Sequence, residues 1–410
     1  MRPESKWHIE TPAFWRDPHT AWAEMRRQAP VYPQDNPDAP ILWNRGTAWY
    51  FTRYDDCVAV LRDTQRFVKD VHLAFDAEQL AAMPPDPPFV KLGNRSMINQ
   101  EDPEHARLRR LVSLAFSPSR VRGMRDRIEA VAHELLDAIV DQGEADLKES
   151  FAFPLPITVI AEILGFPRED HHKLRDWAPL APPRDAAETR RTQEGVDRLT
   201  DYLLAMFDQR RAEPKDDLIT ALIQAESNGE RLSDDDLLAM VILLTSAGFE
   251  TTLNTLLNGT LALLHHPDQL ALLRDQPELV EFAVEEILRY EPPIHTGTLR
   301  WAAVDVEMRG QQIRRGDRIL PVVAAANRDP ERFPDPNRFY IQREDNKHIA
   351  FGIGTHFCTG APLARLELQI AFPILLERLP NLRLAIPDEE IEWEFFFPFR
   401  RLAALPVAWR

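Results

Sequence analysis

The sequence predicts a mainly α-helical protein with a minor β region. Apolar residues recur with helical spacing along most of the chain after about residue 100. Before that point, two short apolar runs lie between turn-forming residues, which is typical of strands. The 34 prolines among 410 residues exceed the roughly 5% of average proteins and lie mainly between these elements. They therefore mark connections rather than the interiors of helices or strands.

Composition limits the class of protein. With 410 residues, 44% of them hydrophobic, the chain can bury a large core, and its length alone would suggest two or three domains. The 65 acidic and 49 basic residues give a net charge of −16, which argues against general nucleic-acid binding. Cys57 and Cys358 are the two cysteines, so a disulfide scaffold and any four-cysteine metal site are excluded.

Neither a signal peptide nor a membrane anchor is expected. The first residues, 1–7, lack the apolar core of a signal peptide. The longest apolar run, 237–249, is shorter than the ~20 residues that span a bilayer. The sequence therefore predicts a soluble, cytoplasmic protein.

The first predicted elements are strands around 31–32 and 48–52, which flank a turn-rich stretch at 36–46. An amphipathic helical pattern follows at 54–61, and it predicts that Cys57 lies in the core. A second irregular stretch, 83–88, has the sequence Met-Pro-Pro-Asp-Pro-Pro. Its four prolines break any helix there and separate the elements on either side of it.

The next helix places two basic residues on one face. His105 and Arg109 are spaced i, i+4 within the segment 102–110, so their side chains are neighbours on the helix surface. Each residue alone would most simply be a solvated surface charge. Together they could instead bind an anionic ligand, because buried anions require cationic partners.

A long helix is predicted from Ser233 to about His265. Ser233 and Asp236 form a capping-box pattern ahead of an extended apolar-periodic run. At ~1.5 Å per residue this helix would be about 50 Å long, enough to cross a domain.

The middle of that helix, 245–252, combines small residues with hydroxyls and a carboxylate. Gly248 should cost roughly 1 kcal/mol relative to alanine, and an unpaired buried Glu250 would cost more. An exposed polar stripe or a helix–helix contact through small residues would explain the pattern. A site for a flat ligand also explains it, with Glu250 and Thr251 as a proton donor and a hydroxyl relay.

Two further features complete the pattern. Glu286 and Arg289 are spaced i, i+3 on one helix face, although an exposed pair of this kind contributes only ~0–1 kcal/mol. Cys358 lies between glycines in the stretch 351–360, and a helical pattern begins directly after it. Glycines allow close backbone approach and the start of a helix favours an anion, so Cys358 could be a thiolate metal ligand. A lone cysteine is otherwise most often a small buried hydrophobe.

The stretch 351–360 resembles the haem-thiolate loop of the cytochrome P-450 family, Phe-x-x-Gly-x-His/Arg-x-Cys-x-Gly, at every fixed position. Residues 247–251 are similar to the Ala-Gly-x-Asp/Glu-Thr motif of the same family, and 286–289 to its Glu-x-x-Arg helix. The motifs appear in the family's order along nearly the whole chain. The resemblance therefore implies one cytochrome P-450 domain over 1–410, a helical body around a buried haem with small β-sheets, the β-rich part lying before about residue 100.

The resemblance also assigns roles to individual residues. It implies haem b with Cys358 as the axial ligand and Glu250 with Thr251 as the proton-delivery pair. Glu286, Arg289 and Arg338 would form a structural network that braces the haem-binding core. The remaining residues implied to contact the haem or its propionates are His105, Arg109, Ala247, Gly248, Arg300, Phe351, Gly352, His356 and Gly360.

The implied reaction is the activation of dioxygen to hydroxylate, or otherwise oxidise, an apolar small organic molecule. Electrons would come from NAD(P)H through a reductase and a ferredoxin or flavodoxin, and the protein would act as a monomer. The pocket is expected to draw on residues 72–98 and on Leu243, Leu244, Ala247, Ile294, His295, Thr296, Phe396 and Phe397. The alternatives are a haem-thiolate peroxygenase, isomerase or dehydratase, and a non-enzymatic haem sensor.

Overall fold

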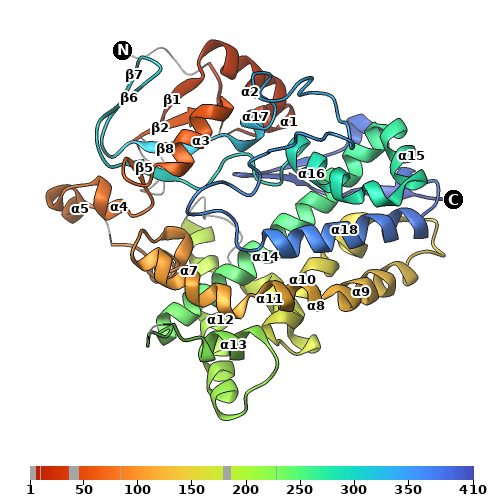
Figure 1. Ribbon diagram of the computed structural model, residues 1–410, viewed down its shortest axis with the longest axis horizontal. Helices are drawn as coiled ribbons and strands as arrows, with labels where there is room; N and C mark the ends of the chain where they lie inside the picture. The colour runs from red at the N-terminus through yellow and green to blue at the C-terminus, as the bar shows by residue number, and fades with distance from the viewer. Residues whose placement is uncertain (1–5, 10, 37–45, 84, 179–185, 228) are drawn as a thin grey trace.

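The computed structural model describes residues 6–9, 11–36, 46–83, 85–178, 186–227 and 229–410, and helices form most of it (Figure 1). The helices are α1 Pro12–Arg16, α2 Pro18–Gln28, α3 Tyr54–Arg62, α4 Val71–Ala74, α5 Ala77–Ala82, α6 Pro88–Asn94, α7 Glu104–Ala115, α8 Pro118–Gly123, α9 Arg125–Asp137, α10 Pro154–Leu164, α11 His171–Trp177, α12 Ala186–Ala212, α13 Leu218–Gln224, α14 Asp234–His265, α15 Pro267–Asp275, α16 Val280–Tyr290, α17 Val323–Ala326 and α18 Ala361–Arg378.

The main sheet pairs strands from residues 31–68 with strands from residues 300–321. Its strand order is β1-β2-β8-β5-β3, with β1 antiparallel and β8 parallel to β2. Its strands are β1 Val31–Asn36, β2 Gly46–Phe51, β3 Phe67–Val68, β5 Arg300–Ala302 and β8 Arg318–Pro321. The smaller sheets contain β4 Glu144–Asp146, β6 Val306–Met308, β7 Gln311–Ile313, β9 Arg383–Leu384, β10 Trp393–Phe396, β11 Phe399–Leu402 and β12 Pro406–Ala408.

The two early strands and the helix after them were predicted correctly, and Cys57 is fully buried as expected. The turn-rich stretch at 36–46 lies almost entirely outside the described residues. The prediction that the β region lies before residue 100 was incomplete, because β4 to β12 follow later. These strands are two to four residues long, too short to produce a recognisable alternating pattern.

The long helix α14 runs through the helical body. Ser233 caps it, with the reciprocal contacts of a capping box to Asp236, as the sequence predicted. Gly259 lets it pack closely, since a Cβ there would lie 2.7 Å from Phe372 Cζ of α18 and 2.8 Å from Ile287 Cγ2 of α16. These contacts hold α14 against α18, which follows the Cys358 loop, and against α16, which contains Glu286 and Arg289.

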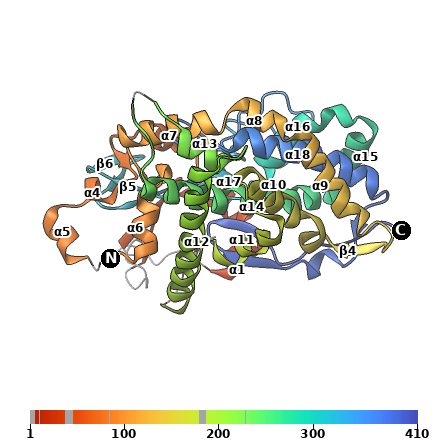
Figure 2. The ribbon, with the colours of Figure 1, turned by 90° about the horizontal axis from the view of Figure 1, so that it is seen from below.

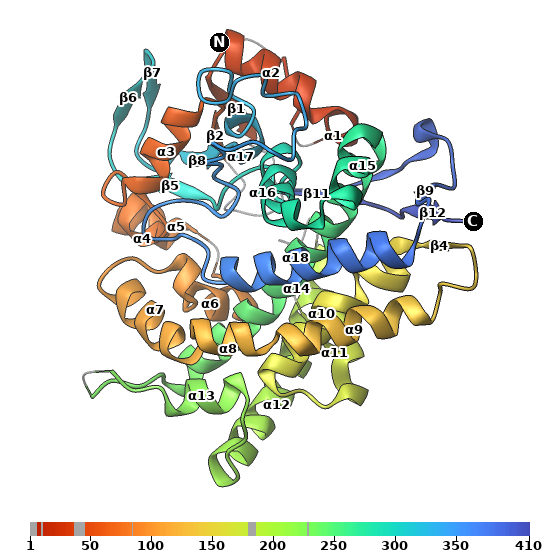
Figure 3. The ribbon, with the colours of Figure 1, turned by 45° about the vertical axis from the view of Figure 1, so that its right-hand side comes forward.

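Helix α18 lies between α16 and α9 (Figure 3). Its N-terminus directly follows Cys358, so this packing fixes where the loop 351–360 ends. On the opposite side of α14, α12 and α13 form an outer layer, and one end of α12 projects from the body (Figure 2).

One helix among the described residues, α14, is long and apolar enough by composition to cross a membrane. Of its most apolar window, 67% is buried inside the protein. Burial of that extent is what the core helix of a soluble protein shows.

Candidate active site

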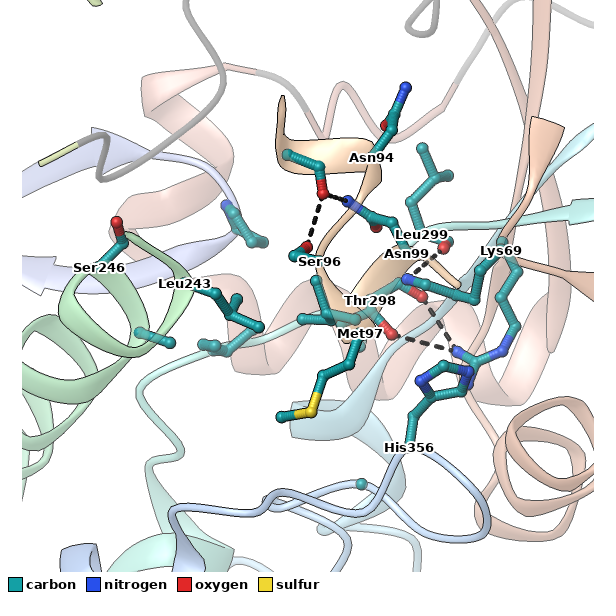
Figure 4. A pocket seen from close by; sticks show the side chains of 18 of the residues that line it. Lys69, Asn94, Ser96, Met97, Asn99, Leu243, Ser246, Thr298, Leu299 and His356 are labelled. Atoms are coloured by element: carbon teal, nitrogen blue, oxygen red, sulfur yellow. Dashed lines mark hydrogen bonds between the residues drawn. The ribbon is translucent and has the colours of Figure 1, made fainter. Parts of the chain in front are cut away.

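A large cavity in the described part of the chain has a volume of about 1920 Å³. Its walls come from α14, from the loop 351–360, and from the segment that includes α6 and the 3-10 turn Met97–Asn99. Figure 4 shows Leu243 and Ser246 of α14 across the cavity from Lys69 and His356. The cavity thus brings together segments that are far apart in the sequence.

Cys358 faces this cavity from the loop. Its side chain is accessible although it lies deep in the protein, because the accessible surface is that of the cavity. The Cys358 N–H donates to the carbonyl of Phe351 at 2.9 Å, which closes the loop. Gly352 and Gly354 have φ angles of +70° and +80°, a conformation that strongly favours glycine. A Cβ on Gly354 would also lie 3.2 Å from the carbonyl oxygen of Leu61.

The protein alone does not lower the pKa of this thiol, contrary to the expectation from its place before α18. Burial raises the pKa of Cys358, and the N–H groups of Gly360 and Ala361 with the positive charge of Arg109 oppose that rise only in part. A bound metal cation deprotonates a coordinating thiol outright. The loop therefore supplies position and shielding, and a metal would be needed to stabilise the thiolate.

A cluster of basic side chains lies beside the Cys358 loop. His105, Arg109, Arg300 and His356, which the sequence predicted, all line the cavity, and so does Lys69, which it did not. Lys69 donates from Nζ to the carbonyl of Leu299 at 2.9 Å, next to Arg300 in the wall (Figure 4). No sequence pattern distinguished Lys69, because it follows a two-residue strand.

The electrostatics of this cluster favour an anionic ligand. Burial and the neighbouring cation of Lys69 lower the pKa of His356 to about 2, and burial lowers that of Arg300 to about 10. Arg300 Nε and His356 Nε2 are buried and have no hydrogen-bond partner among the described residues. A cofactor with two carboxylates would satisfy these donors and offset the crowded positive charge. The residues present therefore fit the haem that the sequence resemblance implies.

The wall formed by α14 combines small residues with a hydroxyl. Ala247, Gly248 and Thr251 line the cavity, and the Thr251 hydroxyl donates to the Ala247 carbonyl at 2.9 Å. Gly248 also serves a helix–helix contact, since a Cβ there would lie 3.0 Å from Ile160 Cγ1 of α10. The helix–helix contact that the sequence left open is therefore present, and the site for a flat ligand stays a prediction that the position of Ala247 and Gly248 at the cavity wall allows.

Glu250 does not line the cavity. Its side chain is 3% exposed, and its Oε1 accepts a hydrogen bond from Asn254 Nδ2 at 3.0 Å. Arg401 Nη1 lies 3.4 Å from the same oxygen. The acid and the alcohol of the predicted pair thus occupy neighbouring positions of α14 but have different surroundings.

The predicted ion-pair network is present with one member changed. Glu286 and Arg289 are both fully buried and joined by two hydrogen bonds of 2.7 and 2.8 Å. The third side chain is Arg343, whose Nε lies 3.1 Å from Glu286 Oε2. The prediction of Arg338 was wrong, because only its carbonyl joins the network, while its guanidinium stacks on Tyr340. Arg343 lies five residues further on, past the loop that reverses the chain.

Most of the predicted substrate residues lie in the cavity wall. Those lining it are Leu243, Leu244, Ala247, Ile294, Thr296 and Phe397, together with much of 72–98. The side chain of Phe396 lies outside the described part of the chain. His295 does not line the cavity. It is fully buried, accepts a hydrogen bond from Trp22 Nε1 at 3.3 Å, and contacts Glu291.

His295 belongs to a compact cluster behind that wall. The ligand-type atoms of His19, Glu291 and His295 lie within 4.8 Å of one another. However, Arg328 and Arg400 each approach Glu291 to 3.5 Å, so its charge is already neutralised. The cluster is therefore a buried ion network that supports the cavity wall, and its positive neighbours disfavour a metal cation.

Glu367 is a cavity residue that the sequence reasoning missed. It lies on α18, is 2% exposed, and its Oε2 has no hydrogen-bond partner among the described residues. Burial raises the pKa of this carboxyl well above its usual value. A signal was present, because Glu367 interrupts the apolar positions Leu363, Leu366 and Ile370 of the predicted helix.

Comparison with known proteins finds relatives that match nearly the whole chain. The family model described as "Cytochrome P450" matches residues 153–392. "Polyketide biosynthesis cytochrome P450 PksS" of Bacillus subtilis is 39% identical over 403 residues, covering 98% of this chain and 98% of the relative. "Cytochrome P450 monooxygenase PikC" of Streptomyces venezuelae is 41% identical over 403 residues, covering 97% and 92%. The solved structure of the Bacillus subtilis bacillaene polyketide synthase protein PksS matches with a TM-score of 0.91 at 38% identity, covering 98% of this chain and 99% of that one.

Proposed function

The chain belongs to the cytochrome P450 family and is a haem-thiolate monooxygenase, and from that premise we propose that Cys358 is the thiolate ligand of its haem iron. One observation carries this assignment. Cys358 lies at the wall of a large cavity beside a cluster of buried cations whose donors lack partners. A haem would supply both a cation for the thiol and carboxylates for the cluster.

The residues that would hold the haem come from five segments of the chain. Arg109, Arg300 and His356, with His105 and Lys69, would bind the propionates, and the loop 351–360 would hold the iron side. Ala247 and Gly248 would leave room for a flat ring beside α14. When bound, the haem supplies the activation of dioxygen, with the thiolate donating electron density to the iron.

Thr251 is proposed to deliver protons within the cavity. Its hydroxyl donates to the Ala247 carbonyl, which leaves its oxygen lone pairs available to accept a proton or a hydrogen bond from the cavity side. Glu250 would resupply Thr251 with protons from the neighbouring position of the helix. The apolar residues of the wall would exclude bulk water, so protons would arrive only through such groups.

The substrate is proposed to be a large apolar polyketide of macrolactone size. The cavity of about 1920 Å³ exceeds the ~300–1,000 Å³ of ordinary ligand pockets, so space would remain beside a haem. A relative named for polyketide biosynthesis matches nearly the whole chain, which supports the same class. Hydroxylation of an unactivated carbon on such a molecule is the reaction expected.

Electrons are proposed to come from NAD(P)H through a ferredoxin or flavodoxin and its reductase. We further propose a cytoplasmic, monomeric protein that forms a single domain over 1–410. The net charge of −16 argues against nucleic acid as a partner.

The decisive test is product formation by the purified protein with a surrogate ferredoxin, its reductase and NADPH. A set of polyketide macrolactones would first be screened for spectral shifts that report displacement of the distal water. Oxygen- and NADPH-dependent hydroxylation of a binding macrolactone would support the proposal. Turnover with peroxide alone and none with the electron-transfer system would identify a peroxygenase instead. A spectral shift without any turnover would favour a sensor.

A further inference from the structure

Glu250 needs a supply of protons that does not come from the cavity. It is 2% exposed and absent from the cavity wall, and the wall itself is mainly apolar. Each proton that leaves the Glu250 carboxyl toward Thr251 must therefore be replaced from another side of α14. The contacts of Glu250 show which side is polar.

Glu250 is linked to the surface through one guanidinium. Arg401 Nη1 lies 3.4 Å from Glu250 Oε1, and Arg401 Nε lies 2.6 Å from Glu394 Oε2. The exposed fraction of the side chains rises along this series, from 3% for Glu250 to 19% for Arg401 and 37% for Glu394. Two contacts thus span the distance from a buried carboxylate to one in solvent.

The fold holds this link in place. Glu394 of β10 and Arg401 of β11 are directly paired across the hairpin, so their side chains lie on the same face. Lys148 Nζ lies 3.4 Å from Glu394 Oε1 and donates to the carbonyls of Leu402 and Ala403 at 2.9 and 2.8 Å. On the inner side, Asn254 Nδ2 fixes the Glu250 carboxylate at 3.0 Å.

We propose that Arg401 and Glu394 are positioning residues for the monooxygenase reaction, and that they form the solvent-side end of the proton supply to Glu250. Arg401 holds the Glu250 carboxylate toward the hairpin; when this ion pair opens, a hydronium ion that enters from the Glu394 side gives its proton to Glu250 and leaves as water. The protonated carboxyl is then free of its ion pair and can turn to Thr251, while Arg401 stays with Glu394. The guanidinium keeps its charge throughout, and the proton moves from water to Glu250 to Thr251. This inference rests on the proposed role of Glu250 and Thr251.

The test compares R401M, R401K and E394Q with the wild-type holoenzyme. The matched control is E392Q, since Glu392 lies two residues before Glu394 in the chain, is exposed, and is outside the series. The probe substrate is a 14-membered polyketide macrolactone, or dodecanoic acid if the macrolactone gives no spectral shift. NADPH-driven turnover is measured in H₂O and D₂O, and peroxide-driven turnover is measured alongside, because peroxide brings its own protons.

R401M should lower NADPH-driven turnover roughly tenfold, less than the 10²–10⁴-fold typical of loss of an acid or base itself. Its solvent isotope effect should increase, and peroxide-driven turnover should stay unchanged. R401K should restore most of the rate, E394Q should show a smaller defect than R401M, and E392Q should behave as wild type. Equal losses with NADPH and peroxide would mean that Arg401 is only structural, and a normal R401M would also overturn the proposal.

Two further measurements separate this inference from the proposed proton relay. If E250Q and T251A turn over normally, the relay itself is wrong. If they are impaired while R401M is normal, only the present inference fails. Independently of turnover, thermal unfolding of R401M, E250Q and the double variant should be non-additive, with R401M causing a smaller drop in Tm when Glu250 is already neutral. Additive drops would show that the two residues are not coupled.

Discussion

Replacing Glu286 by glutamine keeps the shape of the side chain but removes the charge that holds the network under the Cys358 loop. Its carboxylate accepts two hydrogen bonds from Arg289 and others from Arg343, the Tyr340 N–H and Asn346. Glu286 and Arg289 are both fully buried, so the variant would leave a guanidinium in the core without a counter-ion. Removal of one partner of a buried pair costs roughly 3–5 kcal/mol, and we expect E286Q near the lower end because glutamine still accepts hydrogen bonds.

The neighbouring residue provides the control. Glu285 pairs with Arg365 at 2.6 Å and with His348 at 3.0 Å, but the side chains of Glu285 and Arg365 are 28% and 31% exposed, so E285Q should cost less than E286Q at pH 7. Urea unfolding of both variants, followed by tryptophan fluorescence and far-UV circular dichroism, measures the difference. Haem retention after gel filtration reports whether the network also supports the cofactor. Equal losses for E286Q and E285Q would refute the reasoning, because burial would then have no bearing on the cost.

Three other outcomes follow from the same structure. Burial opposes ionisation of Glu285, but hydrogen bonds from Arg365 lower its pKa to about 2. The folded state of the wild type should therefore lose stability as the pH falls from about 4.5 to 2, and E285Q should not show this loss. Urea midpoints measured over this pH range test the difference. Burial raises the pKa of Glu367, so the folded protein keeps a proton on this carboxyl that the unfolded chain releases above pH 4.5. Wild-type stability should therefore fall as the pH rises above 4.5. E367Q should not show this fall, and its stability should match or exceed that of the wild type at pH 8. G259A should destabilise by about 1–3 kcal/mol in urea, since its Cβ would lie 2.7 Å from Phe372 Cζ, and an unchanged midpoint would contradict this packing.

The features that could be predicted from the sequence are those that depend on short local patterns of residues. The capping box at Ser233, the length of α14 and the early strands all follow from local chemistry that acts over a few residues. The loop with Cys358 could be recognised because its glycines are required by backbone geometry, as the positive φ angles of Gly352 and Gly354 show. Local requirements of this kind leave a trace in the sequence.

What the sequence did not predict depends on contacts between distant segments. Lys69 enters the cation cluster because a two-residue strand pairs with β5, and nothing near Lys69 signals that pairing. Arg343 replaces Arg338 in the network because the intervening loop folds back on α16. Arg401 meets Glu250 only because the hairpin β10–β11 packs on α14. Tertiary neighbours of this kind are set by the whole fold rather than by spacing along the chain.

The most direct test of the central claim is the absorption spectrum of the reduced protein with carbon monoxide. Haem ligated by the Cys358 thiolate should give the strongly red-shifted Soret band of thiolate coordination, and C57S should keep that band because Cys57 is buried away from the cavity. C358H should lose the band without losing the fold. A histidine-type band in the wild-type protein, or a thiolate-type band that survives in C358H, would contradict the account.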